Sequence, residues 1–190
     1  MVPYEPPPEL AGLSLAQMAE AVALRRLPPI DQWTPAQTGD SLMRIAADGT
    51  WWHDGGRITR PAMVRAFSAL LLRDSDGQHY LLTPFEKLTI AVDDAAFVAT
   101  DMQVRRDDEG RTMLAFRLNT DDLVLAGPDH AFRIAGTPDV PAFYIGVRHG
   151  TEARLNRSTY AQLIDHALTL SAPDALAVDS GGVRYSLLPA

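Results

Sequence analysis

Two pairs of arginines stand directly before predicted helices, where they could form an anion site. Arg57 and Arg60 precede one apolar helical pattern, and Arg154 and Arg157 precede another 97 residues later. A cation at a helix N-terminus opposes the helix dipole, so it is unfavourable unless a negative group lies close. Free backbone N–H groups beside guanidinium groups bind phosphate or carboxylate well. We therefore predict that all four arginines are ligand-binding residues.

A scaffold role is the alternative for the same arginines. Each could pair with an acid of a neighbouring hairpin, such as Asp74, Asp76 or Asp94, and so hold the fold together. Thr59 and Asn156 are the predicted N-caps, because a side-chain oxygen accepts a hydrogen bond from the first turn of a helix. The pattern alone leaves both roles open.

A second candidate is the segment Thr83-Pro84-Phe85-Glu86-Lys87, which has no counterpart elsewhere in the chain. On a strand, adjacent Glu86 and Lys87 would point to opposite faces and could not act together on one ligand. On a turn they could. We predict both as ligand-binding residues, with a solvated turn as the alternative.

The tandem Trp51-Trp52 lies on a predicted strand. Successive side chains of a strand point to opposite faces, so one indole is expected in the core and the other on the opposite face. If that face lines a groove, its ring could stack on a flat ligand.

Several kinds of chemistry are excluded or unsupported. The chain has no cysteine, which rules out disulfides, thiolate nucleophiles and cysteine-based metal sites. Its histidines lack the spacing of zinc hydrolases, and its acidic pairs are typical of hairpin turns rather than calcium loops. Neither a phosphate-binding glycine loop nor a nucleophile elbow is present. We predict no metal and no cofactor, and the catalytic residues, if any, stay unknown.

Composition limits the class of protein. The chain has 190 residues, of which 46% are hydrophobic and 22% charged, enough for one domain or two small ones with a normal core. Its formal charge of −7 repels nucleic acid. We find no export signal, and the longest apolar run falls short of a membrane span. The prediction is a soluble cytoplasmic protein without nucleic-acid or membrane partners, and its protein partners stay unknown.

Local signals predict the elements that would carry these residues. Ser14 and Gln17 form a capping box for a first helix, which Pro28 and Pro29 end. A surface connector leads to Gly39, and short strands follow from Leu42. Further helices are expected after Thr59, with Pro61 in the first turn, and over about residues 157–170. A hairpin over residues 176–186 closes the chain.

The chain also repeats itself. Arg73-Asp74-Ser75-Asp76-Gly77 reappears as Arg106-Asp107-Asp108-Glu109-Gly110, in addition to the repeated arginine pairs. Internal repetition with hairpin-rich strands predicts an α+β fold of two small lobes, built from repeated strand–strand–helix and β-hairpin units with a groove between them. The predicted divisions are an N-terminal arm, helix and connector over 1–39, a first lobe over 40–104 and a second lobe over 105–190.

The stretch from Pro28 onward resembles a proteobacterial family of unknown function, DUF1285. The resemblance is carried by Pro28-Pro29-Ile30 with Trp33, Asp48-Gly49-Thr50-Trp51, Asp76-Gly77 with Tyr80, and Thr83-Pro84 with Glu86-Lys87. It implies a two-lobed structure of repeated motifs. It also implies a cleft between the lobes for a nucleotide-like ligand and a role in signalling.

Three functional hypotheses follow. The first is a protein that binds a small anionic, nucleotide-like ligand in the groove, with a regulatory role. The second is an enzyme acting on a phosphate- or carboxylate-bearing substrate, with Glu86 or an aspartate as base; a carboxylate of raised pKa beside the arginines would favour it. The third is a scaffold that uses an exposed sheet edge or apolar patch for protein–protein interaction.

Overall fold

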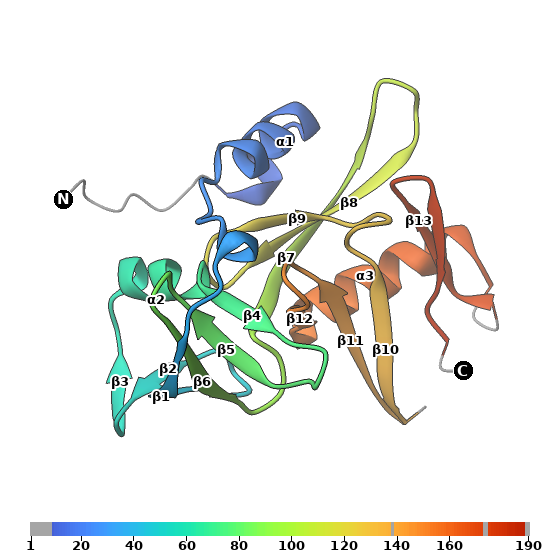
Figure 1. The fold of residues 1–190 in the computed structure, drawn as a ribbon. Helices are drawn as coiled ribbons and strands as arrows, with labels where there is room; N and C mark the ends of the chain where they lie inside the picture. Colours follow the sequence, from blue (N-terminus) through green and yellow to red (C-terminus); the bar gives the residue numbers. More distant parts are fainter. Residues whose placement is uncertain (1–8, 138, 173–174, 189–190) are drawn as a thin grey trace.

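A computed structural model of the chain describes residues 9–137, 139–172 and 175–188. Among these residues there are three α-helices: α1 (Leu15–Leu24), α2 (Pro61–Ser68) and α3 (Arg157–Leu170). Short 3-10 helices span Leu10–Gly12 and Ile30–Gln32. The strands are β1 Gln37–Ile45, β2 Trp51–His53, β3 Gly56–Ile58, β4 Leu71–Arg73, β5 His79–Leu82, β6 Glu86–Val92, β7 Phe97–Arg106, β8 Thr112–Leu118, β9 Leu123–Leu125, β10 Phe132–Thr137, β11 Val140–Gly146, β12 Glu152–Leu155, β13 Ala177–Ser180 and β14 Val183–Ser186 (Figure 1).

The strands form two six-stranded sheets and one small hairpin. The N-terminal sheet has the order β3-β2-β1-β6-β5-β4, and the C-terminal sheet has the order β10-β11-β12-β7-β8-β9. In each sheet the two central strands, β1 with β6 and β12 with β7, are parallel, and the outer strands pair antiparallel. Strands β13 and β14 pair with each other as the expected final hairpin. The predicted α+β class and the two lobes are confirmed.

The two sheets share a strand order, but their helices stand at different points of it. Helix α2 joins the edge strands β3 and β4, whereas α3 follows the central strand β12. The sequence pattern aligned these two helices as equivalent members of a repeat. Strand pairing, which decides topology, places them in different surroundings.

Two boundaries differ from the expected ones. Strand β1 already begins at Gln37, within the stretch predicted as a connector, because residues 37–40 pair with the parallel strand β6. The C-terminal sheet begins at Phe97, within the range assigned to the first lobe. The first eight residues of the predicted arm lie outside the described residues.

Helix capping explains where the helices begin. Ser14 accepts a hydrogen bond from the Gln17 amide at 3.2 Å while Gln17 accepts one from the Ser14 amide at 2.8 Å, which confirms the capping box of α1. Asn156 caps α3 by accepting from the Thr159 amide at 2.8 Å. The predicted cap of α2 was wrong: Arg60 is the N-cap residue, not Thr59, and no side chain caps this end among the described residues.

One continuous hydrophobic core joins the two lobes. It runs from Ile45 and Leu71 in the N-terminal sheet to Phe97 and Phe116 in the C-terminal sheet. Trp51 is buried in this core and stacks on Phe67 of α2 with ring centroids 6.4 Å apart, while neighbouring Trp52 is half-buried. The predicted division of the two indoles between opposite faces agrees with this difference in burial.

At the β1–β2 turn the two lobes come into close contact. Gly49 has a φ of +83°, and a Cβ atom at this position would lie 2.5 Å from the Asn119 side chain and 3.0 Å from Val98. Asn119 in turn donates to the Gly49 carbonyl at 3.3 Å and accepts from the Val98 amide at 3.0 Å. Glycine is favoured here, because a side chain would be strained in this backbone conformation and would have to displace Asn119.

Candidate functional site

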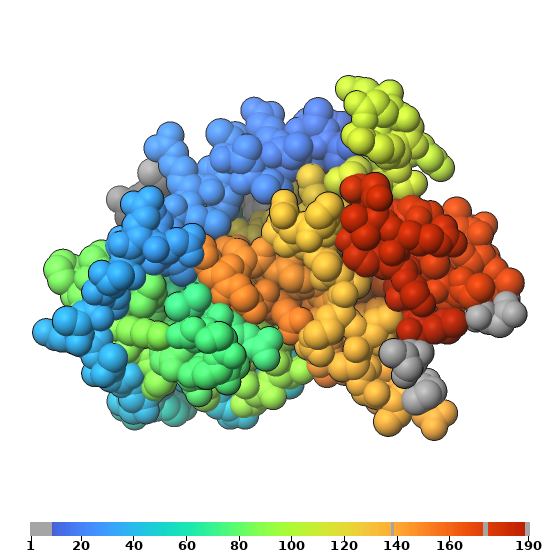
Figure 2. Space-filling view, turned by 45° about the vertical axis from the view of Figure 1, so that its right-hand side comes forward, coloured from blue at the N-terminus to red at the C-terminus, as the bar shows by residue number. Residues whose placement is uncertain are grey.

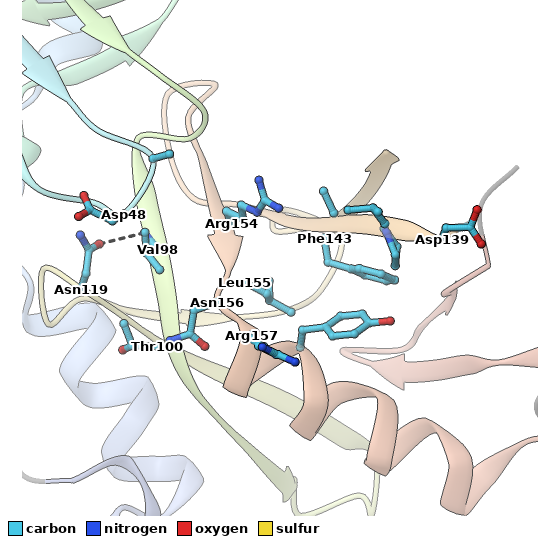
Figure 3. Close-up of a pocket in the computed structure, with 15 residues that line it drawn as sticks. Asp48, Val98, Thr100, Asn119, Asp139, Phe143, Arg154, Leu155, Asn156 and Arg157 are labelled. Carbon is cyan, nitrogen blue, oxygen red and sulfur yellow. Dashed lines mark hydrogen bonds between the residues drawn. The ribbon is translucent and has the colours of Figure 1, made fainter. Parts of the chain in front are cut away.

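A cavity of about 780 Å³ opens between the β1–β2 turn and the C-terminal sheet. The turn contributes Ala47 and Asp48, and the start of α3 contributes Arg157 and Tyr160 (Figure 3). This volume falls within the range of small-molecule sites. The remaining lining residues come from strands β7, β11 and β12, the residues next to them, and the β8–β9 turn: Val98, Thr100, Asn119, Asp139, Val140, Pro141, Ala142, Phe143, Arg154, Leu155 and Asn156.

The N-terminus of α3 contributes positive charge to the cavity wall. Arg157 is the first residue of this 14-residue helix and is exposed. Among the described residues, no hydrogen bond or ion pair occupies its guanidinium group, and no acidic residue lies in the first turn. The helix dipole and a free guanidinium group therefore act together at this wall.

Arg154 lines the same cavity, but it already has a partner. Its Nη1 donates to Asp94 Oδ2 at 2.7 Å, and Tyr144 donates to the other carboxylate oxygen at 2.6 Å. The bond to Asp94 raises the pKa of Arg154, while burial and then Asp94 raise the pKa of Tyr144. The scaffold alternative, in which an arginine pairs with Asp94, thus applies to Arg154 and not to Arg157.

The cavity wall also contains acidic residues, Asp48 and Asp139. Asp48 accepts hydrogen bonds from the Thr50 hydroxyl at 2.7 Å and the Thr50 amide at 2.9 Å. These bonds, and more weakly the charge of Arg57, hold the pKa of Asp48 below its usual value. Asp48 is therefore ionised at neutral pH. An occupant of this cavity meets both guanidinium groups and carboxylates, with Arg154 and Arg157 between Asp48 and Asp139 in Figure 3.

A second cavity of about 450 Å³ is lined by both Gly49 and Asn119. Both cavities share Asp48 and Asn119 as walls, and the second also contains Arg57 and Asp121. Burial, together with the neighbouring charge of Asp122, raises the pKa of Asp121. The predicted arginine site is thus divided, with Arg57 in one cavity and Arg154 and Arg157 in the other.

The other predicted site residues line neither cavity. Arg60 is exposed at the start of α2. Glu86 and Lys87 are the first residues of β6, which is a strand rather than a turn, so they point to opposite faces. Lys87 donates to Asp74 at 2.6 Å and lies 4.1 Å from the centre of the Tyr80 ring. Its contacts are those of a structural ion pair.

Sequence reasoning missed several cavity residues. Asn119 and Asp139 carry no local motif, and Tyr160 was interpreted only as part of the apolar face of a helix. Asp48 was interpreted only as a turn residue. The proximity of the second arginine pair to a predicted N-cap was the one signal that pointed to this wall.

Neither a metal site nor a spanning helix is found within the described ranges. No group of three or more histidine, aspartate or glutamate side chains is placed there to hold a metal ion. None of the helices described has the length and apolar character needed to cross a bilayer.

The sequence matches known protein families along most of its length. Residues 28–95 match the N-terminal domain of a domain of unknown function, DUF1285, and residues 96–187 match the C-terminal domain of the same family. The division between these matches falls just before β7, where the second sheet begins. No curated protein matches the chain.

Two solved structures are similar. A DUF1285 family protein from Silicibacter pomeroyi DSS-3 is 38% identical, with 92% of this chain and 94% of that chain covered and a TM-score of 0.76. A DUF1285 family protein from Shewanella baltica OS155 is 22% identical, with 66% and 91% covered and a TM-score of 0.53. The second likeness concerns the fold alone.

Proposed function

The chain belongs to the DUF1285 family, whose function is unknown, and we propose from the cavity itself that the protein binds a small anionic ligand at the N-terminus of α3. The observation that carries this proposal is Arg157 at the start of α3, whose guanidinium group has no partner among the described residues and lines a cavity of about 780 Å³. An unpaired cation at that position is unfavourable unless an anion joins it. A bound phosphate or carboxylate supplies that anion.

The other lining residues indicate the chemistry of the ligand beyond its anionic group. Phe143, Pro141 and Tyr160 form an apolar side on which a flat or hydrocarbon part can pack. Asp48 and Asp139 repel a second anion but accept hydrogen bonds from hydroxyl or amino groups. The ligand class is therefore an anionic group attached to a neutral part that carries hydrogen-bond donors, and nucleotide-like molecules belong to it. A regulatory role would depend on such binding.

The experiment is a thermal-shift screen with inorganic phosphate, pyrophosphate, nucleotides and sugar phosphates. A ligand at 100 times its Kd adds about 2.7 kcal/mol of stability. For a protein of this size that corresponds to several degrees, at about 2–4 °C per kcal/mol. Arg157→Ala is expected to abolish the shift.

Arg60→Ala is the matched control, because Arg60 precedes the other helix and lines neither cavity. It should leave any ligand-induced shift unchanged. A screen without any shift, or a shift that survives Arg157→Ala, contradicts the proposal.

One observation favours an enzyme as the second candidate. Asp121, whose pKa is raised, lines the smaller cavity, which Arg57 also lines. A carboxylate of raised pKa in a cavity that also contains a cation is suited to general acid–base chemistry. If a ligand from the screen is turned over slowly and Asp121→Asn stops the turnover without reducing binding, this second function is supported. Stable ligand over days contradicts it.

A further inference from the structure

A buried carboxylate joins three distant parts of the chain. Asp122, with 3% of its side chain exposed, accepts hydrogen bonds from Arg25 Nε at 2.6 Å and from Arg148 Nη2 at 3.1 Å. Thr120 donates to it at 3.0 Å, and Arg65 Nη2 lies 3.7 Å away. We call Asp122 with Arg25, Arg65 and Arg148 the Asp122 cluster. Arg25 comes from the end of α1, Arg65 from α2 and Arg148 from the β11–β12 connection.

The same arginines also hold the last turn of α2. Arg25 donates to the Arg65 carbonyl and Arg148 to the Ser68 carbonyl, both at 3.2 Å, and Arg65 donates to the Thr120 carbonyl at 2.7 Å. Carbonyls at a helix C-terminus carry a partial negative charge that favours cations. The cluster therefore fastens the N-terminal lobe to the C-terminal lobe.

The N-terminal arm, which the structure describes from residue 9 to residue 36, supplies Arg25. Leu10 and Met18 are buried against Ala115 of the C-terminal sheet, and α1 packs against β9. Arg105 donates to the Leu13 carbonyl at 3.1 Å. In Figure 2 the arm (blue) forms a band across the upper surface, from the N-terminal lobe to the C-terminal lobe. Arg25 precedes the residues that match the family, which begin at 28.

A second polar contact fixes the far end of the arm. The Asp31 carboxylate lies 2.9 Å from His149 Nδ1, in the β11–β12 connection that also carries Arg148. The arm therefore spans both lobes and touches the C-terminal lobe at each end of α1 and again near Asp31.

Charge in the Asp122 cluster is not matched, because three guanidinium groups share one carboxylate. Burial lowers the pKa of Arg65, and the charge of Arg25 lowers it further. Burial likewise lowers the pKa of Arg148; Asp122 opposes this shift, and the two other arginines add smaller contributions that lower the pKa. Arg25 is thus attracted by Asp122 and repelled by Arg65 and Arg148. The net attraction that docks the arm is the difference between these two electrostatic contributions.

The turn Asn119–Asp122 connects the cluster to the cavities. Its last residue, Asp122, is held by Arg25, and its first, Asn119, is a wall of both cavities. Thr120 and Asp121 line the smaller cavity. Asp122 is therefore only three residues along the chain from Asn119, whose side chain contacts Gly49.

We propose that the N-terminal arm regulates the ligand cavity of its own chain: Arg25 on Asp122 orders the turn Asn119–Asp122, and release of the arm loosens that turn and weakens ligand binding. The coupling of arm and turn stands on the contacts above, while the effect on binding rests on the proposed function. Linkage is reciprocal, so a ligand in the cavity must favour the docked arm to the same degree.

Hydrogen exchange measured by mass spectrometry tests the first part without any ligand. The variant is Arg25→Gln, and the matched control is Arg26→Gln, since Arg26 is exposed and makes no hydrogen bond or ion pair among the described residues. Arg25→Gln is expected to speed exchange about tenfold both in the arm and at the amides of Asn119 and Asp121, which bond to the Val98 and Leu118 carbonyls. Equal exchange at these two amides in both variants overturns the proposal.

Titration with pyrophosphate tests the second part. Wild type and Arg26→Gln should bind alike, and Arg25→Gln should bind about tenfold more weakly. Equal affinity of Arg25→Gln and wild type overturns the inference and leaves the proposed function standing. Absence of pyrophosphate binding to wild type, together with a screen that shows no ligand, overturns the proposed function and the regulatory inference that rests on it.

Discussion

The starts of α2 and α3 carry similar sequences and differ in nearly every physical respect. Arg60 is itself the N-cap residue of α2 and makes no capping bond, whereas Arg157 follows Asn156, which caps α3 at 2.8 Å. Helix α2 has 8 residues and α3 has 14. Because Asn156 occupies the N-cap position of α3, Arg157 is the first helical residue and lies at the positive end of the helix dipole. Arg60 itself occupies the N-cap position of α2 and so lies just outside that helix.

The preceding strands explain why only one of these starts lines the larger cavity. Helix α3 follows β12, a central strand, so its N-terminus emerges in the middle of the molecule. Helix α2 follows the edge strand β3 and is held instead at its C-terminal end by Arg25 and Arg148. Residue types alone therefore do not make a site; the position of the preceding strand decides what the helix start faces.

The largest expected effect on the free energy of unfolding comes from the Asp122 cluster, which holds the last turn of α2. Asp122→Ala removes the buried carboxylate that Arg25 and Arg148 share and leaves these half-buried guanidinium groups without its counter-charge. Breaking a buried ion pair in this way costs about 3–5 kcal/mol. Urea denaturation followed by circular dichroism measures the loss.

Asp93→Ala is the matched comparison. Asp93 pairs with Arg44 at the surface, and such pairs contribute about 0–1 kcal/mol. Similar midpoints for the two variants would mean that the Asp122 cluster does not hold the lobes together.

The pH dependence of the Asp122 contribution has a definite sign. Burial raises the pKa of Asp122, but Arg148 and Arg25 outweigh burial and hold the pKa below its usual value. A carboxyl group whose folded pKa is depressed adds stability above its unfolded pKa, about 3.9. That stability is lost as pH falls below about 4, so wild type and Asp122→Ala should converge in acid.

Much of the local structure followed from the sequence, since its signals are local. The capping box of Ser14 and Gln17 and the cap at Asn156 each involve residues three apart. The Asp122 cluster could not be predicted, because Arg25 and Asp122 are 97 residues apart and acidic pairs are common in turns. The equivalence of the two helices was inferred from apolar periodicity, which does not determine strand order.

A smaller effect is expected where the two lobes meet between the cavities. Gly49→Ala forces a non-glycine residue into a left-handed conformation and places its Cβ 2.5 Å from the Asn119 side chain. The conformation alone costs about 1–2 kcal/mol, and displacement of Asn119 adds to it. Gly55→Ala has a similar φ of +78° with nothing within 4 Å, so it isolates the conformational cost. The thermal midpoint should be lower for Gly49→Ala than for Gly55→Ala, and equality would mean that the lobes do not press together here.

The capping difference between the two helix starts is tested by a matched pair of substitutions. Asn156→Ala removes the bond to the Thr159 amide and should cost about 1 kcal/mol. Thr59→Ala should change the free energy of unfolding by less than about 0.5 kcal/mol, because Thr59 caps nothing. A loss for Thr59→Ala as large as that for Asn156→Ala would contradict the assignment of the caps and the comparison built on it.

The smallest effect concerns one histidine in each lobe. Burial, and then the charge of Arg106, lowers the pKa of His166 in α3. Burial, and then Arg73, lowers the pKa of His79 in β5, with Glu152 opposing. Each histidine binds its proton more weakly in the folded than in the unfolded state. Stability is therefore complete above about pH 6.5 and is lost as pH falls through the folded pKa.

One proton changes the free energy of unfolding by at most about 1.4 kcal/mol per pH unit, and partial solvent exposure of both rings reduces this further. Thermal midpoints between pH 7 and pH 5 should fall less steeply in His166→Gln than in wild type, and again less steeply in His79→Gln. If the pH dependence of the thermal midpoint becomes weaker only in His166→Gln, the two lobes differ in proton binding as well as in helix capping. An unchanged slope in both variants would show that other groups set the acid response, which would confine the difference between the lobes to α2 and α3.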